Sequence, residues 1–210
     1  MTDASRDVPL FPLNTVLFPG GLLPLRIFEQ RYLEMSKDCL RAGTPFGVCL
    51  IRDGAEVGTP ATHASLGCLA RIIEWDMQQL GLLQLLAQGG ERFRVLASHA
   101  RADGLILADI ELLAEAADTP MPEKYRACGQ LLECIVAEHG ERLFAKPFRL
   151  DSCAWVGARL AEVLPLPAAA RQKLLELDDG VQRLEIIQRL LEESALLAKD
   201  SDAPDRSRQS

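Results

Sequence analysis

Lysine, histidine and aromatic residues are scarce in this 210-residue sequence, which has five lysines, three histidines and 5% aromatic residues. No lysine follows a glycine, which excludes the glycine-rich loop ending in lysine that binds nucleotide phosphates. The paired zinc ligands C-x-x-C and H-E-x-x-H are missing, as is the G-x-S-x-G turn that exposes a catalytic serine. We therefore predict no catalytic residue, no metal site, no cofactor and no enzymatic activity.

Positive charge is also in short supply. The formal net charge is -7 and the isoelectric point is near 5.1, which would repel a phosphate backbone. The arginines are scattered along the chain and form no basic patch. We predict that the protein does not bind nucleic acid.

The sequence lacks a secretory signal and an uninterrupted apolar run. Residues 1–7 are polar and have mixed charge, without the basic start and apolar stretch of a signal peptide. Residues 8–25 are mostly apolar, but four prolines prevent them from forming one membrane-spanning helix. The six cysteines lie in apolar surroundings and are interpreted as reduced core residues. These features predict a cytoplasmic protein that does not bind membranes.

The first half of the chain has the patterns of β-strands. Residues 106–112 alternate between an apolar face and a face that includes acidic residues, as half-buried strands do. Residues 46–51 are apolar on both faces and predict a central strand. Three further strands are predicted at residues 69–73, 82–87 and 92–97.

Pairs containing glycine separate these strands and favour tight antiparallel hairpins, because glycine readily adopts positive φ angles. The pairs are Asp53-Gly54, Gly89-Gly90 and Asp103-Gly104. Several short antiparallel strands would leave costly open edges unless the sheet curls. A small barrel or half-barrel is therefore predicted.

Trp75 and Trp155 are interpreted as core or interdomain packing.

Helical spacing appears once among the strands and dominates after residues 118–122, where two prolines break the strand pattern. The first helix is predicted to end at Gly43; its buried stripe is Tyr32, Met35, Ser36, Cys39 and Leu40. A later stripe predicts a helix that ends near Gly140. Three more helices are predicted from their start signals, which are Ser152, Pro167, and Asp178 or Asp179.

These patterns predict an α+β protein. Residues 1–118 form a β-rich part, residues 119–198 form a helical bundle, and residues 199–210 form a disordered tail.

Residues 9–32 carry the densest motif, which is rich in proline and leucine. It predicts two short strands joined by the turn Pro19-Gly20-Gly21, with the prolines limiting each strand to a sheet edge or a strand start. The second strand leads directly into the first helix. Arg26, Glu29 and Arg31 are close enough in sequence to form a charge cluster.

This motif resembles the amino-terminal substrate-binding domain of Lon proteases, in its free-standing bacterial form. The resemblance rests first on Phe11-Pro12-Leu13, Phe18-Pro19-Gly20, Pro24 to Glu29 and Arg31-Tyr32. Further similar residues follow in order, among them Phe46-Gly47-Val48, Glu56-Val57-Gly58 and Arg92-Phe93-Arg94. The resemblance extends over about residues 8–198.

The resemblance implies a PUA-like antiparallel β pseudo-barrel with one helix, followed by a C-terminal α-helical bundle. It also implies recognition of unfolded or extended polypeptide segments, in concert with a protease or chaperone, without the ATPase and protease modules of full-length Lon. The candidate peptide-binding residues are Phe18, Leu22, Leu23, Arg26, Phe28, Glu29, Gln30, Arg31 and Tyr32.

Three alternatives remain open at this point. These residues could serve only to build the barrel and anchor the first helix. The protein could bind RNA, as a PUA-like fold would suggest and its negative charge would oppose. It could also be an enzyme whose site the sequence does not reveal.

Overall fold

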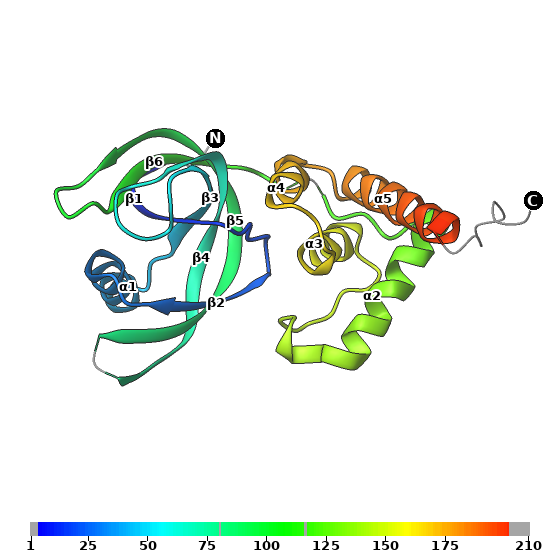
Figure 1. Ribbon diagram of the computed structural model, residues 1–210, viewed down its shortest axis with the longest axis horizontal. Coiled ribbons are helices and arrows are strands. Elements are labelled where there is room, and N and C mark those ends of the chain that lie inside the picture. The colour runs from blue at the N-terminus through cyan, green and yellow to red at the C-terminus, as the bar shows by residue number, and fades with distance from the viewer. Residues whose placement is uncertain (1–3, 80, 116, 202–210) are drawn as a thin grey trace, which may run out of the picture.

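The computed structural model describes residues 4–79, 81–115 and 117–201, which form a β-rich part and a helical part side by side (Figure 1). The predicted α+β class is confirmed. The six strands are β1 (Ala4–Leu13), β2 (Leu22–Ile27), β3 (Phe46–Asp53), β4 (Thr62–Gln79), β5 (Leu82–Ala100) and β6 (Ile106–Leu112). The helical part follows β6 along the chain.

The strands form one curled sheet in the order β2-β5-β4-β3-β1-β6, and β5 also pairs with β6. The long strand β5 thus joins both ends of a five-strand ring, and β2 lies outside the ring on the first half of β5. All pairs are antiparallel except β1 with β3. The parallel pair was not predicted; it arises because β2 and α1 (Gln30–Ala42) lie between the two strands in sequence and provide the crossover.

The predicted first helix is confirmed as α1, and it ends at Gly43, whose φ of 68° is left-handed. Its buried side chains include Tyr32, Met35 and Cys39, which pack on the same apolar core as Phe11, whereas Leu40 of the predicted stripe is exposed. The Phe11 and Tyr32 rings stack with centroids 3.9 Å apart. This side of α1 therefore contributes to the core of the β-rich part.

Two predictions about turns and prolines are wrong. Gly89-Gly90 is not a hairpin turn; both residues lie within β5, and neither has a positive φ. The two strands of the motif are joined by residues 14–21 instead of a tight turn alone. β1 is not an edge strand because it lies between β3 and β6, whereas β2 is an edge strand as predicted. β1 pairs with β3 on one side and β6 on the other. Pro12 is tolerated in β1 because its missing N–H removes one hydrogen bond from only one of these two pairings.

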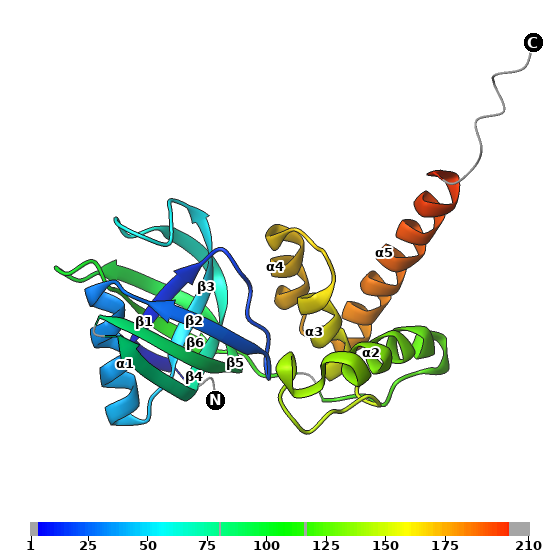
Figure 2. The ribbon, with the colours of Figure 1, turned by 60° about the horizontal axis from the view of Figure 1, so that its bottom comes forward.

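The helical part begins with the 3-10 turn η1 (Glu123–Tyr125) and contains a second one, η2 (Gly140–Arg142). Its helices are α2 (Arg126–His139), α3 (Cys153–Val163), α4 (Ala168–Glu176) and α5 (Gly180–Ser201). Figure 2 shows α5 projecting away from the β-rich part. None of the helices in the described ranges is long and apolar enough to cross a membrane. The predicted tail begins too early, because residues 199–201 belong to α5; residues 202–210 lie outside the described residues.

Polar caps start α3 and α5 as the sequence predicts. The Trp155 N–H donates to the Ser152 hydroxyl over 3.0 Å, and the Val181 N–H donates to the Asp179 carboxylate over 2.8 Å. Each cap satisfies one of the amides that a helix start leaves without an intrahelical partner. Pro167 lies one residue ahead of α4.

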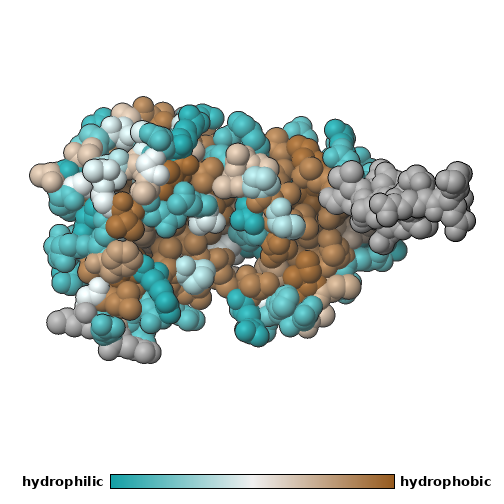
Figure 3. Space-filling model, in the orientation of Figure 1, coloured by the Kyte–Doolittle hydropathy of each residue, from teal (hydrophilic) through white to brown (hydrophobic). Residues whose placement is uncertain are grey.

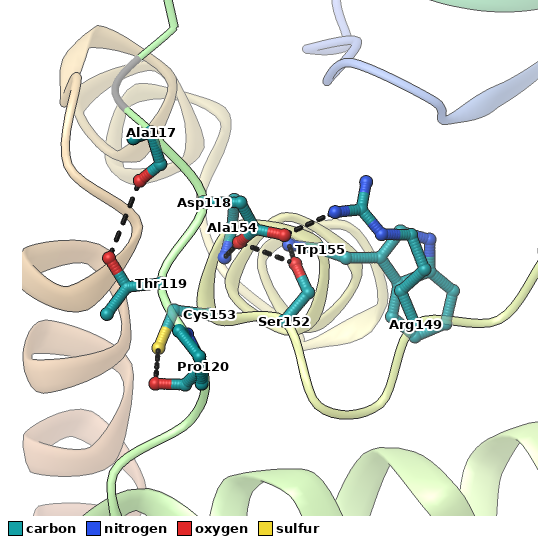
Figure 4. A network of polar contacts seen from close by, with 9 residues as sticks. All are labelled: Ala117, Asp118, Thr119, Pro120, Arg149, Ser152, Cys153, Ala154 and Trp155. Atoms are coloured by element: carbon teal, nitrogen blue, oxygen red, sulfur yellow. Dashed lines mark hydrogen bonds and ion pairs between the residues drawn. The ribbon is translucent and has the colours of Figure 1, made fainter.

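Asp118 fastens the connection between the two parts to the start of α3 (Figure 4). One of its carboxylate oxygens accepts from the Ser152 hydroxyl over 2.8 Å, and the other pairs with Arg149. The Cys153 N–H donates to the Thr119 carbonyl over 3.1 Å. The boundary predicted at residue 118 therefore falls in a segment that is bonded to the helical part.

Candidate functional site

The Phe18-Pro19-Gly20-Gly21 segment lies between the two parts of the molecule. Phe18 is fully buried in an apolar cluster shared with residues of the helical part. The Arg159 guanidinium, also fully buried, donates to the Pro19 carbonyl over 2.8 Å. The Gly20 N–H donates to the Gly89 carbonyl of β5 over 2.8 Å. This segment connects the two parts. Phe18 is closed to a ligand, whereas Pro19 and Gly20 are half-buried and line a hollow between the parts.

Arg92 also holds the two parts together, and Arg183 fixes the loop that Arg92 binds. Arg92 of β5 is buried and donates to the carbonyls of Leu175 and Leu177, each over 3.0 Å. It also pairs with Asp178 at 2.9 Å. Arg183 of α5 donates to the Leu177 carbonyl over 2.7 Å, so the loop after α4 is bound from both sides. The relative position of the two parts is thus fixed by charged hydrogen bonds as well as by apolar packing.

Glu162 completes this interface through an ion pair with Arg159, whose Nε lies 3.0 Å from the carboxylate. Burial raises the pKa of Glu162 to about 7, although the Arg159 and Arg171 guanidinium groups and a hydrogen bond from the Phe18 backbone oppose this change. The interface therefore contains a carboxyl group that titrates near neutral pH.

We expect wild type to lose stability relative to Glu162→Gln as the pH rises from 4.5 to about 7. The folded protein holds the Glu162 proton more tightly than the unfolded chain, so the contribution is full below pH 4.5 and is lost as pH passes the folded pKa. Glutamine does not ionise and lacks this contribution. Urea unfolding of both proteins on either side of the window measures the difference; parallel pH profiles would contradict the assignment.

The predicted charge cluster is only partly formed, and its role is structural. Arg31 is buried, pairs with Glu29 at 3.0 Å and donates to the Gly104 carbonyl over 3.0 Å. Its guanidinium also lies over the Tyr32 ring, 4.6 Å from the centroid. Arg31 and Tyr32 therefore tie α1 to the β-rich part. Arg26 is exposed and joins no ion pair in the part of the chain that the structure describes.

The predicted binding residues thus fall into two groups. Phe18, Leu23, Arg31 and Tyr32 are buried. Leu22 and Glu29 are half-buried, while Arg26, Phe28 and Gln30 are exposed. The second group lies along β2 and at the start of α1. A binding role for the half-buried and exposed residues stays a prediction. The buried residues could support such a site only by holding the exposed ones in place.

β2 has one open edge. Among the described strands it pairs only with β5, and the Gly89 N–H donates to the Gly21 carbonyl over 2.8 Å. Alternate residues of an antiparallel strand bond to the same partner. This bond and the register therefore direct the amides of Leu23, Leu25 and Ile27 to β5, and the backbone groups of Leu22, Pro24 and Arg26 to the open edge.

A hollow of about 330 Å³ lies beside this edge on the core side of β2. Phe11 and Tyr32 contribute to its walls, and the exposed side chains of Phe28 and Val57, at 58% and 53%, lie at its rim. Figure 3 shows apolar surface around α1 and β2, interrupted by hydrophilic residues. The hollow offers an apolar surface next to unpaired backbone groups.

A second hollow, of about 500 Å³, lies on the other side of β2 and shares Pro24, Leu25 and Arg26 with the first. Its walls include Trp75, which is 60% exposed on β4. The interpretation of Trp75 as core packing is therefore wrong, whereas Trp155 packs against Phe144 and Phe148 as predicted. Residues 73–77 of β4 are exposed on both faces, and the acidic residues Glu74 and Asp76 between the apolar ones were the signal for this.

The described residues show no group of three or more histidine, cysteine or acidic side chains that could hold a metal ion. All six cysteines are free, and five are buried. The prediction that the cysteines lie in the core holds for five of them and is wrong for Cys134, which is exposed on α2.

A curled sheet with a capping helix and an open strand edge, joined to a helical bundle, defines a two-part domain of PUA-like type. The chain belongs to the ATP-dependent protease La (LON) substrate-binding domain family, whose model matches residues 7–193. The predicted resemblance is thereby confirmed.

Individual relatives agree with this family. The chain is 26% identical to Lon protease 2 of Myxococcus xanthus, in an alignment that covers 97% of this chain. It is 29% identical to the Lon protease of Paraburkholderia phytofirmans, in an alignment that covers 88% of this chain. It spans about a quarter of the length of these relatives, 25% and 24%. A Lon N-terminal domain protein from Xanthomonas campestris has 37% identity and a TM-score of 0.73, with 89% of this chain and 98% of that chain covered.

Proposed function

We propose that the protein binds extended polypeptide segments along the open edge of β2 and presents them to a protease or chaperone. The observation that carries the proposal is this edge, whose outward backbone groups lie between two hollows. Membership of a substrate-binding family supports polypeptide as the ligand. The described residues contain no metal cluster, and we propose that the chain has no catalytic activity of its own.

Strand addition is the mode of binding that this geometry favours. An extended segment beside β2 would form main-chain hydrogen bonds with Leu22 and Arg26 and place its side chains into the adjacent hollows. Pro24 lacks an N–H, so the edge offers one donor fewer than a regular strand. The resulting ladder is short, and apolar contact with Phe28 supplies the rest of the affinity.

Phe28→Ala is expected to weaken the binding of an unfolded, carboxymethylated model protein about tenfold, because the variant removes the most exposed aromatic side chain at the core-side hollow. The measurement is fluorescence anisotropy of the labelled model protein. Leu96→Ala is the matched control, since Leu96 is also 58% exposed but lies on β5 away from both hollows. Equal affinity of wild type and Phe28→Ala would overturn this placement of the site.

A further inference from the structure

We infer that Arg26 selects segments that carry an aspartate or glutamate, flanked by apolar residues, at the position opposite it on β2. This inference rests on the proposed function and specifies its ligand. Its basis is the arrangement of side chains on the two faces of the edge strand.

The two faces of β2 differ in character. Leu23 and Ile27 point into the core, whereas Pro24 and Arg26 are exposed on the opposite face. Side chains of an added strand would alternate in the same way, because neighbouring strands share their pleat. Every second side chain of the segment would therefore meet the core-side hollow, and the intervening ones would meet Arg26 or Pro24.

The core-side hollow favours apolar side chains. Its rim holds Phe28 and Val57, and its floor includes Phe11. The two carboxylates that line it are already engaged: Glu29 pairs with Arg31 at 3.0 Å, and Glu56 accepts from the Asn14 N–H over 2.6 Å. An apolar residue of the segment would bury surface there without breaking either bond.

The outward face presents a cation at the edge itself. Arg26 lines both hollows and is the only arginine or lysine among their walls, all of which are described residues. A residue directly opposite it on an added strand would have its Cβ about 5 Å from that of Arg26. At this distance an opposite charge stabilises the strand pair and a like charge destabilises it.

Glu74 and Asp76 share this outward face, but they lie too far from an added strand to reverse its preference for an acidic residue. The register places Arg26 opposite Gln84 of β5, and Gln84 opposite Asp76 of β4. β4 is therefore three strand spacings, about 14 Å, from an added strand. Because the screening length at physiological salt is about 8 Å, Arg26 dominates at the edge.

Three end-blocked peptides test the inference; they share one alternating apolar sequence and differ only in a central, outward-facing Asp, Asn or Lys. Wild type is expected to bind the Asp peptide about threefold to fivefold more tightly than the Lys peptide, with the difference shrinking at high salt. Arg26→Glu is expected to reverse this order. Arg126→Glu, which makes the same charge change at a 66% exposed residue of α2, is expected to leave it unchanged.

The outcomes separate the inference from the function on which it rests. Equal binding of the three peptides by wild type, or the same order in Arg26→Glu, would overturn the role of Arg26 while leaving strand addition intact. No binding of any peptide by wild type would overturn both. Circular dichroism confirms that each variant is folded before its affinities are compared.

Discussion

Gly89→Ala is expected to lower the free energy of unfolding by about 3 kcal/mol, because the pocket around Gly89 has no room for a methyl group. A Cβ at this position would lie 2.1 Å from the Phe18 carbonyl oxygen and 3.2 Å from the Leu17 side chain. The Phe18 carbonyl cannot easily move, since it accepts from the Gly21 N–H over 2.9 Å and its own ring is fully buried.

Gly90→Ala is the matched control, one residue further along the same strand. The nearest atom to a Cβ at Gly90 would be the Leu69 carbonyl oxygen at 3.6 Å, an ordinary van der Waals contact. This variant is expected to stay within about 1 kcal/mol of wild type. Urea unfolding followed by circular dichroism measures the free energy of unfolding of both variants. Similar values for the two would contradict the steric clash predicted at Gly89.

Arg92→Met is expected to destabilise the protein by about 3 kcal/mol, because methionine keeps most of the buried length but leaves carbonyl groups of the loop after α4 without a donor. The Leu175 carbonyl loses its bond from Arg92, whereas the Leu177 carbonyl keeps one from Arg183. Asp178 is 73% exposed and regains water. The loss should therefore fall mainly on the contact between the two parts, and limited proteolysis between residues 112 and 123 should become faster.

Arg94→Met provides the comparison, because Arg94 lies two residues away on β5 with a 54% exposed side chain. Its ion pair with Glu111, 3.0 Å long, is open to solvent and contributes at most about 1 kcal/mol. A destabilisation of Arg94→Met as large as that of Arg92→Met would contradict the role assigned to the buried guanidinium.

Local signals predicted the helices well. Gly43 ends α1, and Ser152 and Asp179 cap α3 and α5, because each of these roles depends on a residue type within one turn of the helix end. The change from strand to helix near residue 118 was likewise visible in the spacing of apolar residues. Such features depend on neighbours in the sequence and can be read from it directly.

The errors concern contacts between distant residues. Gly89 looks like a turn residue, but its small size serves the close approach of Phe18, more than seventy positions earlier. Phe18 itself looks like an exposed apolar anchor, and only the packing of α3 and α5 reveals that it lies at the interface. Pattern alone shows that a residue is apolar, not which surface covers it.

At the candidate site, too, local sequence signals are visible but contacts between distant residues are not. The motif predicts a site at β2 and the start of α1, and the walls of the hollows there also come from Val57 and Trp75, which are distant in sequence. Their contribution follows from the strand order, and the parallel pair of β1 and β3 that helps set this order has no local signal.

The distribution of thiols leaves a single accessible cysteine for chemical labelling. Cys134 is exposed on α2, whereas the other five cysteines are buried, and burial raises the pKa of Cys49 to about 12. Thiol-directed reagents attack the thiolate, so at neutral pH they should modify Cys134 first. A fluorophore or spin label attached there would report the local mobility and surroundings of α2, without any prior removal of cysteines.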